Sequence, residues 1–249
     1  MIQGIDVSKW QGQIDWAKVK NAGISFAILR CGRSSNSGFY TDKTFEYNYA
    51  QAKSQGIKLG AYYFAGRDCI SYEAGQADAK RMLSICAGKD FELPLFIDIE
   101  AQDAKYKVGI TDAIIGFYDT MKASGRQAGV YASKVSGFKY LIEDDRIQHI
   151  PHWVAQYNTT CTYDKPYIIW QKSSKGSVAG IIGNVDLDEG VDNLFAVNKK
   201  TDLDVVLAVL KGEYGNGEDR KARLEQAGYN ASDVQDKVNK TIAFIQGIL

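Results

Sequence analysis

The sequence predicts an α/β fold in which eight strands close into a barrel with five helices rather than eight, followed by a small helical domain. Three observations lead to this prediction. Strand-like and helix-like segments alternate with a period of roughly 30 residues through the first half of the chain. Strand-like segments then continue with little helix between them, and from about residue 199 the pattern is helical. The length of 249 residues accommodates one large domain and an appendage.

The predicted helices of the first part each end at a glycine that precedes the next strand, at Gly23, Gly56, Gly88 and Gly125. Glycine readily adopts the left-handed conformation that closes many helices. This repeated order of helix, glycine and strand predicts parallel strands joined by right-handed crossovers. The expected helices are 16–22 with Asp15 as cap, 44–55, 72–87, and a helix capped by Thr111 that runs to Ser124. The expected strands are 2–7, 26–29, 59–64, 93–100, 130–132, 152–157, 168–171 and 185–187.

A doubly wound open sheet is the alternative architecture for such an alternating chain. That fold carries a G-x-G-x-x-G fingerprint directly after its first strand. Here Val7 is followed by Ser8-Lys9-Trp10-Gln11-Gly12, which lacks the fingerprint. The closed barrel is therefore preferred.

The fourth predicted strand carries the strongest functional signal, because its apolar run ends in Asp98-Ile99-Glu100. Side chains at i and i+2 of a strand point the same way, roughly 6.5–7 Å apart at the backbone. Two carboxylates that leave a buried strand together are costly to bury without a use. Paired carboxylates at such a separation are typical of glycoside hydrolysis. The alternative interpretation is an ordinary strand end with two solvated acids.

Catalytic groups of barrels lie at the carboxyl ends of the strands. The predicted strand ends carry acids and aromatic residues, each of which alone is more often structural than catalytic. Their convergence on one rim favours a functional site. The residues concerned are Asp6, Arg30, Tyr62, Phe64, Asp98, Glu100, Tyr131, Trp153, Gln156, Trp170, Gln171, Asp186 and Asp188.

Three sets of residues resemble motifs of the family 25 glycoside hydrolases, the Chalaropsis-type lysozymes. The segment 4–16 resembles the opening of that family, and 96–100 is similar to its catalytic D-x-E strand. Later motifs match in order at 153–157, 170–171 and 185–187. The resemblance covers residues 1–195 and implies a TIM-like (β/α)5β3 barrel. It also implies an N-acetylmuramidase that cleaves the β-1,4 bond between N-acetylmuramic acid and N-acetylglucosamine.

The resemblance implies roles for individual residues. Glu100 would be the general acid/base, and Asp98 would be the nucleophile or the group that orients the acetamide of the substrate. Asp6 and Asp186 would give electrostatic support, while Asp188, where the family often has Asn, is expected to be a turn residue. Retention with acetamide participation is the preferred outcome. The expected substrate-binding residues are Arg30, Tyr62, Phe64, Tyr131, Trp153, Gln156 and Trp170.

The tail is expected to consist of a linker at 196–201 and a three-helix domain at 202–249, after the catalytic barrel at 1–195. Its predicted helices are 203–211 after Asp202 as cap, 218–227, and 232–246 with Ser232 as cap. The segment 211–239 resembles the short wall-binding repeats, of the type 7 kind, of some phage lysozymes. That resemblance implies peptidoglycan binding through Tyr214, Asn216, Arg220 and Arg223. A single repeat binds weakly, so a homo-oligomer through this domain would supply avidity; a packing appendage is the alternative.

Composition excludes several classes of partner and cofactor. Lys plus Arg equal Asp plus Glu at 30 each, which gives no reason to expect nucleic acid or an anionic membrane as partner. No apolar run approaches the ~20 residues of a membrane span. The four cysteines and two histidines lack metal-ligand spacing, so no metal or other cofactor is expected. Free cysteines and a first strand that starts at Ile2 predict a protein made in a reducing cytoplasm without a signal peptide. The resemblance to phage lysozymes implies that this is the host cytoplasm and that the protein acts on the cell wall.

The leading hypothesis is therefore a peptidoglycan-cleaving endolysin. A chitinase-like hydrolase is a second hypothesis, since a D-x-E strand also occurs in that class. Phe96 stands where its signature requires an Asp. A wall-binding lectin on an inactive barrel is the third, and the retention of both Asp98 and Glu100 argues against it.

Overall fold

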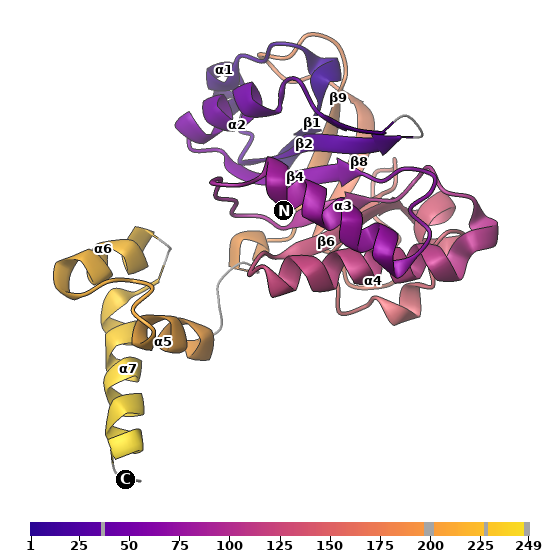
Figure 1. Ribbon diagram of the computed structural model, residues 1–249. Coiled ribbons are helices and arrows are strands. Elements are labelled where there is room, and N and C mark those ends of the chain that lie inside the picture. Colours follow the sequence, from indigo (N-terminus) through magenta and orange to yellow (C-terminus); the bar gives the residue numbers. More distant parts are fainter. Residues whose placement is uncertain (36–37, 197–201, 227–228, 247–249) are drawn as a thin grey trace. The chain divides into compact units, whose positions relative to one another are not determined.

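The computed structural model describes residues 1–249 apart from 36–37, 197–201, 227–228 and 247–249 (Figure 1). The chain forms two compact units, Met1–Val197 and Asn198–Leu249. The linker expected at 196–201 lies, apart from residue 196, outside the described residues. Within the described part of the chain, no helix is long and apolar enough to cross a membrane.

Unit 1 is a closed eight-stranded barrel, which confirms the predicted fold class. The first strand, β1, pairs with β2 on one side and with β9 on the other, and this double pairing closes the sheet. Neighbouring barrel strands are parallel from β1 round to β8. The barrel strands are β1 (Ile2–Val7), β2 (Phe26–Ser35), β4 (Lys58–Phe64), β5 (Leu95–Asp98), β6 (Ala128–Ser133), β7 (His152–Ala155), β8 (Ile169–Gly176) and β9 (Val185–Gly190).

The last strand runs against the rest, because β9 is antiparallel to both β8 and β1. A short connection without a helix returns the chain in the opposite direction, whereas a parallel return requires a long crossover. The expectation that site residues lie at the carboxyl end of this strand is therefore wrong. Asp186 still reaches the same rim, because it lies at the start of β9, directly opposite Asp6 near the end of β1.

Four helices connect the early strands, and a π-helix at Lys134–Lys139 takes the place of the fifth. The interface between α3 and α4 is close, since a Cβ on Gly75 would lie 1.8 Å from the Ala113 carbonyl oxygen. On the other side of the contact, a Cβ on Gly116 would lie 2.2 Å from the Tyr72 carbonyl oxygen. The helices of the barrel are α1 (Trp16–Asn21), α2 (Phe45–Ser54), α3 (Tyr72–Ile85) and α4 (Lys107–Ala123).

The predicted caps are partly correct. Asp15 caps α1, where its side chain accepts a hydrogen bond from the Lys18 amide at 3.1 Å. Thr111 was predicted as the cap of the fourth helix, and this is wrong because α4 begins one turn earlier. Its hydroxyl instead donates to the Lys107 carbonyl at 2.9 Å and accepts from the Glu143 amide at 2.8 Å. Thr111 therefore fastens the loop after the π-helix to α4.

A hairpin that extends β2 was not predicted from the sequence. After the predicted strand 26–29, β2 continues to Ser35 and pairs with β3 (Gly38–Thr41), which lies at the edge of the sheet. The four residues of β3 are exposed, so this strand lacks the apolar pattern that marks a buried one. The hairpin extends β2 beyond its barrel pairing with β4.

The apolar core has two parts. The larger one lies between the strands and the surrounding helices. The smaller one fills the barrel interior with Phe26, Ile28, Phe96, Trp153 and Ile169, among others. Because interior aromatic rings pack tightly, they form a rigid floor under the rim where the acids emerge.

Unit 2 has three helices, which agrees with the prediction: α5 (Asp202–Leu210), α6 (Gly217–Gln226) and α7 (Ala231–Gln246). Ser232 was predicted as the cap of the third helix, but Asn230 has that role. Its side-chain oxygen accepts from the amides of Ser232 at 3.0 Å and Asp233 at 3.2 Å. A separate small core holds the helices together through Val205, Val206, Val209, Leu224, Val234 and Val238.

Candidate active site

A hollow of about 330 Å³ opens at the rim of the barrel, and we call it the acidic hollow. The catalytic acids expected from the sequence, Asp6, Asp98, Glu100 and Asp186, all line it. The other lining residues are Val7, Ser8, Trp10, Gln11, Arg30, Arg33, Tyr62, Phe64, Tyr131, Trp153, Tyr157 and Gln171. The fold thus brings together side chains from β1, β2, β4, β5, β6, β7, β8 and β9.

Asp98 is the last residue of β5, and its side chain is buried. No described group forms a hydrogen bond with its buried Oδ1 atom. Burial raises the pKa of Asp98 well above its usual value, the charge of Glu100 raises it further, and Arg30 acts in the opposite direction. A buried carboxyl oxygen without a partner is costly, so it is a strong candidate to interact with a substrate.

Glu100 follows β5 rather than lying within it, and its side chain is accessible to solvent. The surrounding protein nevertheless removes part of its hydration, and this desolvation, together with the charge of Asp186, raises the pKa of Glu100. A glutamic acid that keeps its proton toward neutral pH can act as a general acid.

Asp6 and Asp186 form a cross-strand pair between β1 and β9. Asp6 is buried and accepts a hydrogen bond from Gln171 Nε2 at 2.6 Å. Burial and the charges of Asp188 and Asp186 raise the pKa of Asp6 well above its usual value. Burial raises the pKa of Asp186 to about 6. The hollow therefore concentrates acids that resist ionisation.

Asp188 was expected to be a turn residue, and this is wrong. It lies in the middle of β9, opposite Gly4 of β1, and it is completely buried. The indole Nε1 of Trp153 donates a hydrogen bond to Asp188 Oδ1 at 2.8 Å, while Oδ2 has no partner among the described residues. Burial raises the pKa of Asp188 to about 8. Asp188 thus supports the floor of the hollow as a neutral acid near pH 7.

Three of the aromatic residues expected to bind substrate form this floor. Trp153 is only 1% exposed, and its ring lies 4.4 Å from that of Tyr131 and 5.9 Å from that of Tyr62, measured between centroids. Tyr62 and Tyr131 are largely buried as well, so these rings present edges or hydroxyl groups rather than open faces. The exposed aromatic side chains of the hollow are instead Trp10, at 75%, and Tyr157, at 61%.

The remaining predicted residues divide into two groups. Arg30 and Phe64 line the acidic hollow. Gln156 and Trp170 do not belong to its lining: Gln156 bonds Thr162 through both ends of its amide at 2.8 Å, and Trp170 Nε1 donates to the Gln156 carbonyl at 2.8 Å. These two residues shape the loop after β7.

The hollow also contains Trp10 and Tyr157, which were not predicted as site residues, and Gln171, which was expected at the rim but was given no role. Gln171 Nε2 bonds Asp6, and its Oε1 accepts from the Tyr131 hydroxyl at 2.9 Å and from that of Tyr157 at 3.3 Å. All three lie in segments that carried the family resemblance. That resemblance was therefore the signal that could have identified them.

Of the four residues expected to bind the wall, Tyr214 and Asn216 lie in the turn before α6, and Arg220 and Arg223 lie on α6 itself. Arg220 is half-buried and donates to the Gly215 carbonyl at 3.0 Å, to Asn216 Oδ1 at 2.8 Å and to Gln235 Oε1 at 3.0 Å. Arg223 is exposed and pairs with Asp219 at 3.0 Å. The Tyr214 ring packs edge-on against another tyrosine of the unit.

The geometry of the acidic hollow agrees with the comparisons. Residues 5–181 match the model of the glycosyl hydrolases family 25, which covers more than half of the chain. The chain belongs to this family. Residues 204–242 match the model of the CW_7 repeat. Both resemblances identified from the sequence are confirmed.

Individual relatives support the same assignment. Lysozyme M1 of Streptomyces globisporus is 32% identical over 200 residues, which span 74% of this chain and 66% of that lysozyme. The chain thus spans slightly less than two thirds of the length of this relative. The crystal structure of the bacterial lysozyme from Streptomyces coelicolor superimposes with a TM-score of 0.65 at 29% identity, over 79% of this chain and 96% of that one. The CTP1L endolysin superimposes with a TM-score of 0.67 at 27% identity, over 86% of this chain and 70% of that one.

No group of three or more His, Cys, Asp or Glu side chains suited to a metal ion occurs among the described residues.

Proposed function

We propose that the chain is an endolysin-type N-acetylmuramidase, which hydrolyses the β-1,4 bond between N-acetylmuramic acid and N-acetylglucosamine in bacterial peptidoglycan. The observation that supports this most strongly is the convergence of Asp6, Asp98, Glu100 and Asp186 on one hollow. Membership of the family and similarity to lysozymes over most of the chain support it further.

Glu100 acts as the general acid in this proposal. It protonates the oxygen that leaves when the glycosidic bond breaks, and it then takes a proton from the attacking water. The raised pKa of Glu100 suits this role, because the acid must still hold its proton when substrate binds. Activity should therefore fall as the pH rises through the pKa of Glu100.

Asp98 stabilises the positive charge that develops on the sugar ring. It does so as a direct nucleophile or by orienting the acetamide of the substrate, and retention follows in either case. The free Oδ1 of Asp98 is available for such a contact. Asp6 and Asp186 give electrostatic support: the charge of Asp186 raises the pKa of Glu100, and Gln171 holds the buried Asp6 in place.

Unit 2 directs the enzyme to the wall in this proposal, so that the site of action is the peptidoglycan layer. Its match to the CW_7 repeat supports this. A homo-oligomer through α7 stays a prediction; the exposed side chains available for it are Ile242, Phe244 and Ile245. The mass of the full chain in solution would test it.

Mass spectrometry of the products released from purified walls tests the function. New reducing ends on N-acetylmuramic acid are expected. Reducing ends on N-acetylglucosamine, or products from chitin, would favour a chitinase-like hydrolase instead. Binding without any product would favour the wall-binding lectin.

A further inference from the structure

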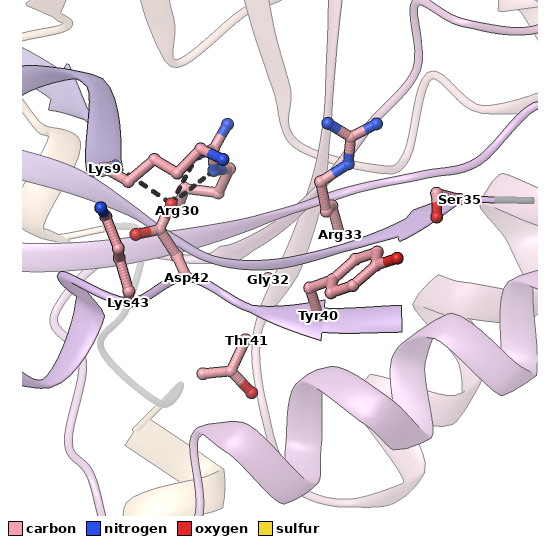
Figure 2. Close-up of a pocket in the computed structure, with 9 residues that line it drawn as sticks. All are labelled: Lys9, Arg30, Gly32, Arg33, Ser35, Tyr40, Thr41, Asp42 and Lys43. Carbon is pink, nitrogen blue, oxygen red and sulfur yellow. Dashed lines mark hydrogen bonds and ion pairs between the residues drawn. The ribbon is translucent and has the colours of Figure 1, made fainter. Parts of the chain in front are cut away.

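A second cavity, of about 440 Å³, adjoins the acidic hollow, and Figure 2 shows the side chains that surround it. Arg30 and Arg33 line both cavities, so the two lie side by side. Lys9 and Lys43 complete a set of four cations, and we call this cavity the cationic pocket. Its volume falls in the range that accommodates small-molecule groups.

Among the described residues that line the cationic pocket, Asp42 supplies the carboxylate, and it is already used within the fold. Asp42 forms an ion pair with Arg30 at 2.6 Å, which Figure 2 draws as dashed lines. It also accepts hydrogen bonds from the Lys9 amide at 3.1 Å and from the Thr44 amide and hydroxyl at 3.0 and 2.8 Å. Burial opposes ionisation of Asp42, but these hydrogen bonds hold its pKa below the usual value. Asp42 therefore fixes Arg30 and balances one charge only.

The other three cations have no carboxylate within ion-pair distance among the described residues. Lys9 Nζ lies 4.8 Å from the centre of the Trp10 ring, and Arg33 lies 5.0 Å from that of Phe64. Arg33 Nε is buried without a hydrogen-bond partner in the described part of the chain. A buried donor without a partner is costly, and an anionic ligand would satisfy it.

A β-bulge explains why both arginines face this region. Arg30 pairs with Tyr62 and Arg33 with Phe64, although they are three residues apart, because the register shifts by one at Cys31. Without this extra residue, strand alternation would place the two arginines on opposite faces of the sheet. The β2–β3 hairpin is close to this point: a Cβ on Gly32 would lie 2.6 Å from the Tyr40 carbonyl oxygen.

We propose that the cationic pocket is a subsite for carboxylates of the peptide attached to muramic acid. This inference rests on the proposed function, because it requires the glycosidic bond to lie in the acidic hollow. The peptide leaves the sugar beside that bond and would enter the adjoining pocket. Guanidinium and ammonium groups there would bind its carboxylates, and amidation of these carboxylates would weaken recognition.

The test compares soluble glycan fragments that carry peptides with free carboxylates and the same fragments with every peptide carboxylate amidated. The measured quantity is the ratio of kcat/KM for the free to the amidated substrate. A loss of kcat/KM that affects both substrates equally leaves this ratio unchanged. For the wild-type chain, a ratio of about 10 is expected from charge-assisted contacts.

Lys43→Gln should lower this ratio by about 3-fold and Arg33→Gln by about 5-fold, since Arg33 is less exposed to solvent. Lys80→Gln is the matched control, because Lys80 is exposed on α3 and lines neither cavity. It should leave the ratio as in the wild type. The thermal melting temperature of each variant verifies that it folds.

Three other outcomes would overturn the proposal. A wild-type ratio near 1 with turnover of both substrates would reject the subsite and leave the muramidase function intact. Absence of cleavage of either substrate would reject the function, and the subsite with it. In the third outcome, Lys43→Gln leaves the ratio unchanged and yet makes the enzyme less sensitive than the wild type to inhibition by poly(glycerol phosphate). That result would assign the pocket to the phosphates of a wall polymer instead.

Discussion

The acids of the acidic hollow and the arginines of unit 2 differ in how the fold satisfies their charges. Asp98 is buried and has an oxygen without a described partner, and its neighbour Glu100 has a raised pKa. Arg220, in contrast, bonds three groups of its own unit. Buried polar groups without hydrogen-bond partners lower the stability of a fold. Such groups are expected at functional sites. The carboxyl groups of Asp98 and Glu100 are thus available to a ligand, while Arg220 primarily holds unit 2 together.

Glu100→Gln should have the largest effect of any change in the acidic hollow. The amide cannot protonate the leaving oxygen, so kcat for wall lysis should fall by about 10³-fold. The decrease in turbidity of a wall suspension measures this. Glu73→Gln, an exposed change on α3, is the matched control and should lyse walls as the wild type does. Lysis by Glu100→Gln within a few-fold of the wild-type rate would reject the assignment of the acid.

Removal of unit 2 distinguishes hydrolysis by the barrel from wall binding by unit 2. A chain that ends at Val197 keeps the whole barrel, so it should fold and hydrolyse soluble glycan fragments. Its binding to intact walls should decrease by about 10-fold or more, because the repeat no longer contributes to the effective concentration at the wall. Co-sedimentation with purified walls measures this. Equal sedimentation of the truncated and full-length chains would identify unit 2 as a packing appendage.

Asp188→Asn tests the stability cost of a buried acid. In the unfolded chain Asp188 ionises near its ordinary pKa, while in the folded chain it keeps its proton up to a pKa of about 8. Between these two values the folded state binds more protons, so the wild-type chain loses stability as the pH rises, by at most about 1.4 kcal/mol per pH unit.

An asparagine at position 188 still offers an oxygen that accepts the hydrogen bond from Trp153 Nε1, but it has no proton to lose in this pH range. At pH 4 the melting temperature of Asp188→Asn should therefore be equal to or lower than that of the wild type. As the pH rises to 8, the variant should become increasingly more stable than the wild type. A constant difference across this range would show that Asp188 does not titrate with folding.

The smallest effects are expected in unit 2, where two neighbouring arginines can be compared. Arg220→Ala leaves the Gln235 and Asn216 side chains without their partner and should destabilise this unit by about 1–2 kcal/mol. Arg223→Ala removes one exposed ion pair and should change stability by less than about 0.5 kcal/mol. Arg223→Ala should still weaken wall binding by a few-fold without changing turnover of soluble fragments. Urea unfolding and co-sedimentation measure the two quantities, and equal effects of both changes would contradict the distinction.

Local sequence was sufficient to locate the eight barrel strands, most helix ends and the acids of the hollow, but not the β2–β3 hairpin. Apolar runs, helix-ending glycines and the D-x-E pattern depend on neighbours within a few residues, so they are readable without the fold. Asp98 and Glu100 were found for this reason. Thr111 and Ser232 were assigned as caps because their residue types favour that role, but a tertiary contact uses Thr111 and Asn230 precedes Ser232.

The tertiary structure alone decided the direction of β9, the burial of Asp188 and the alignment of Arg33 with Arg30. Each of these depends on pairing between segments that are distant in sequence: β9 with β1, Asp188 with Trp153, and the shifted register of β2 against β4. A one-residue register shift reverses the face that a side chain occupies, and no local pattern reveals it. The sequence by itself therefore determined which residues could do chemistry here, while long-range strand pairing decided which of them meet.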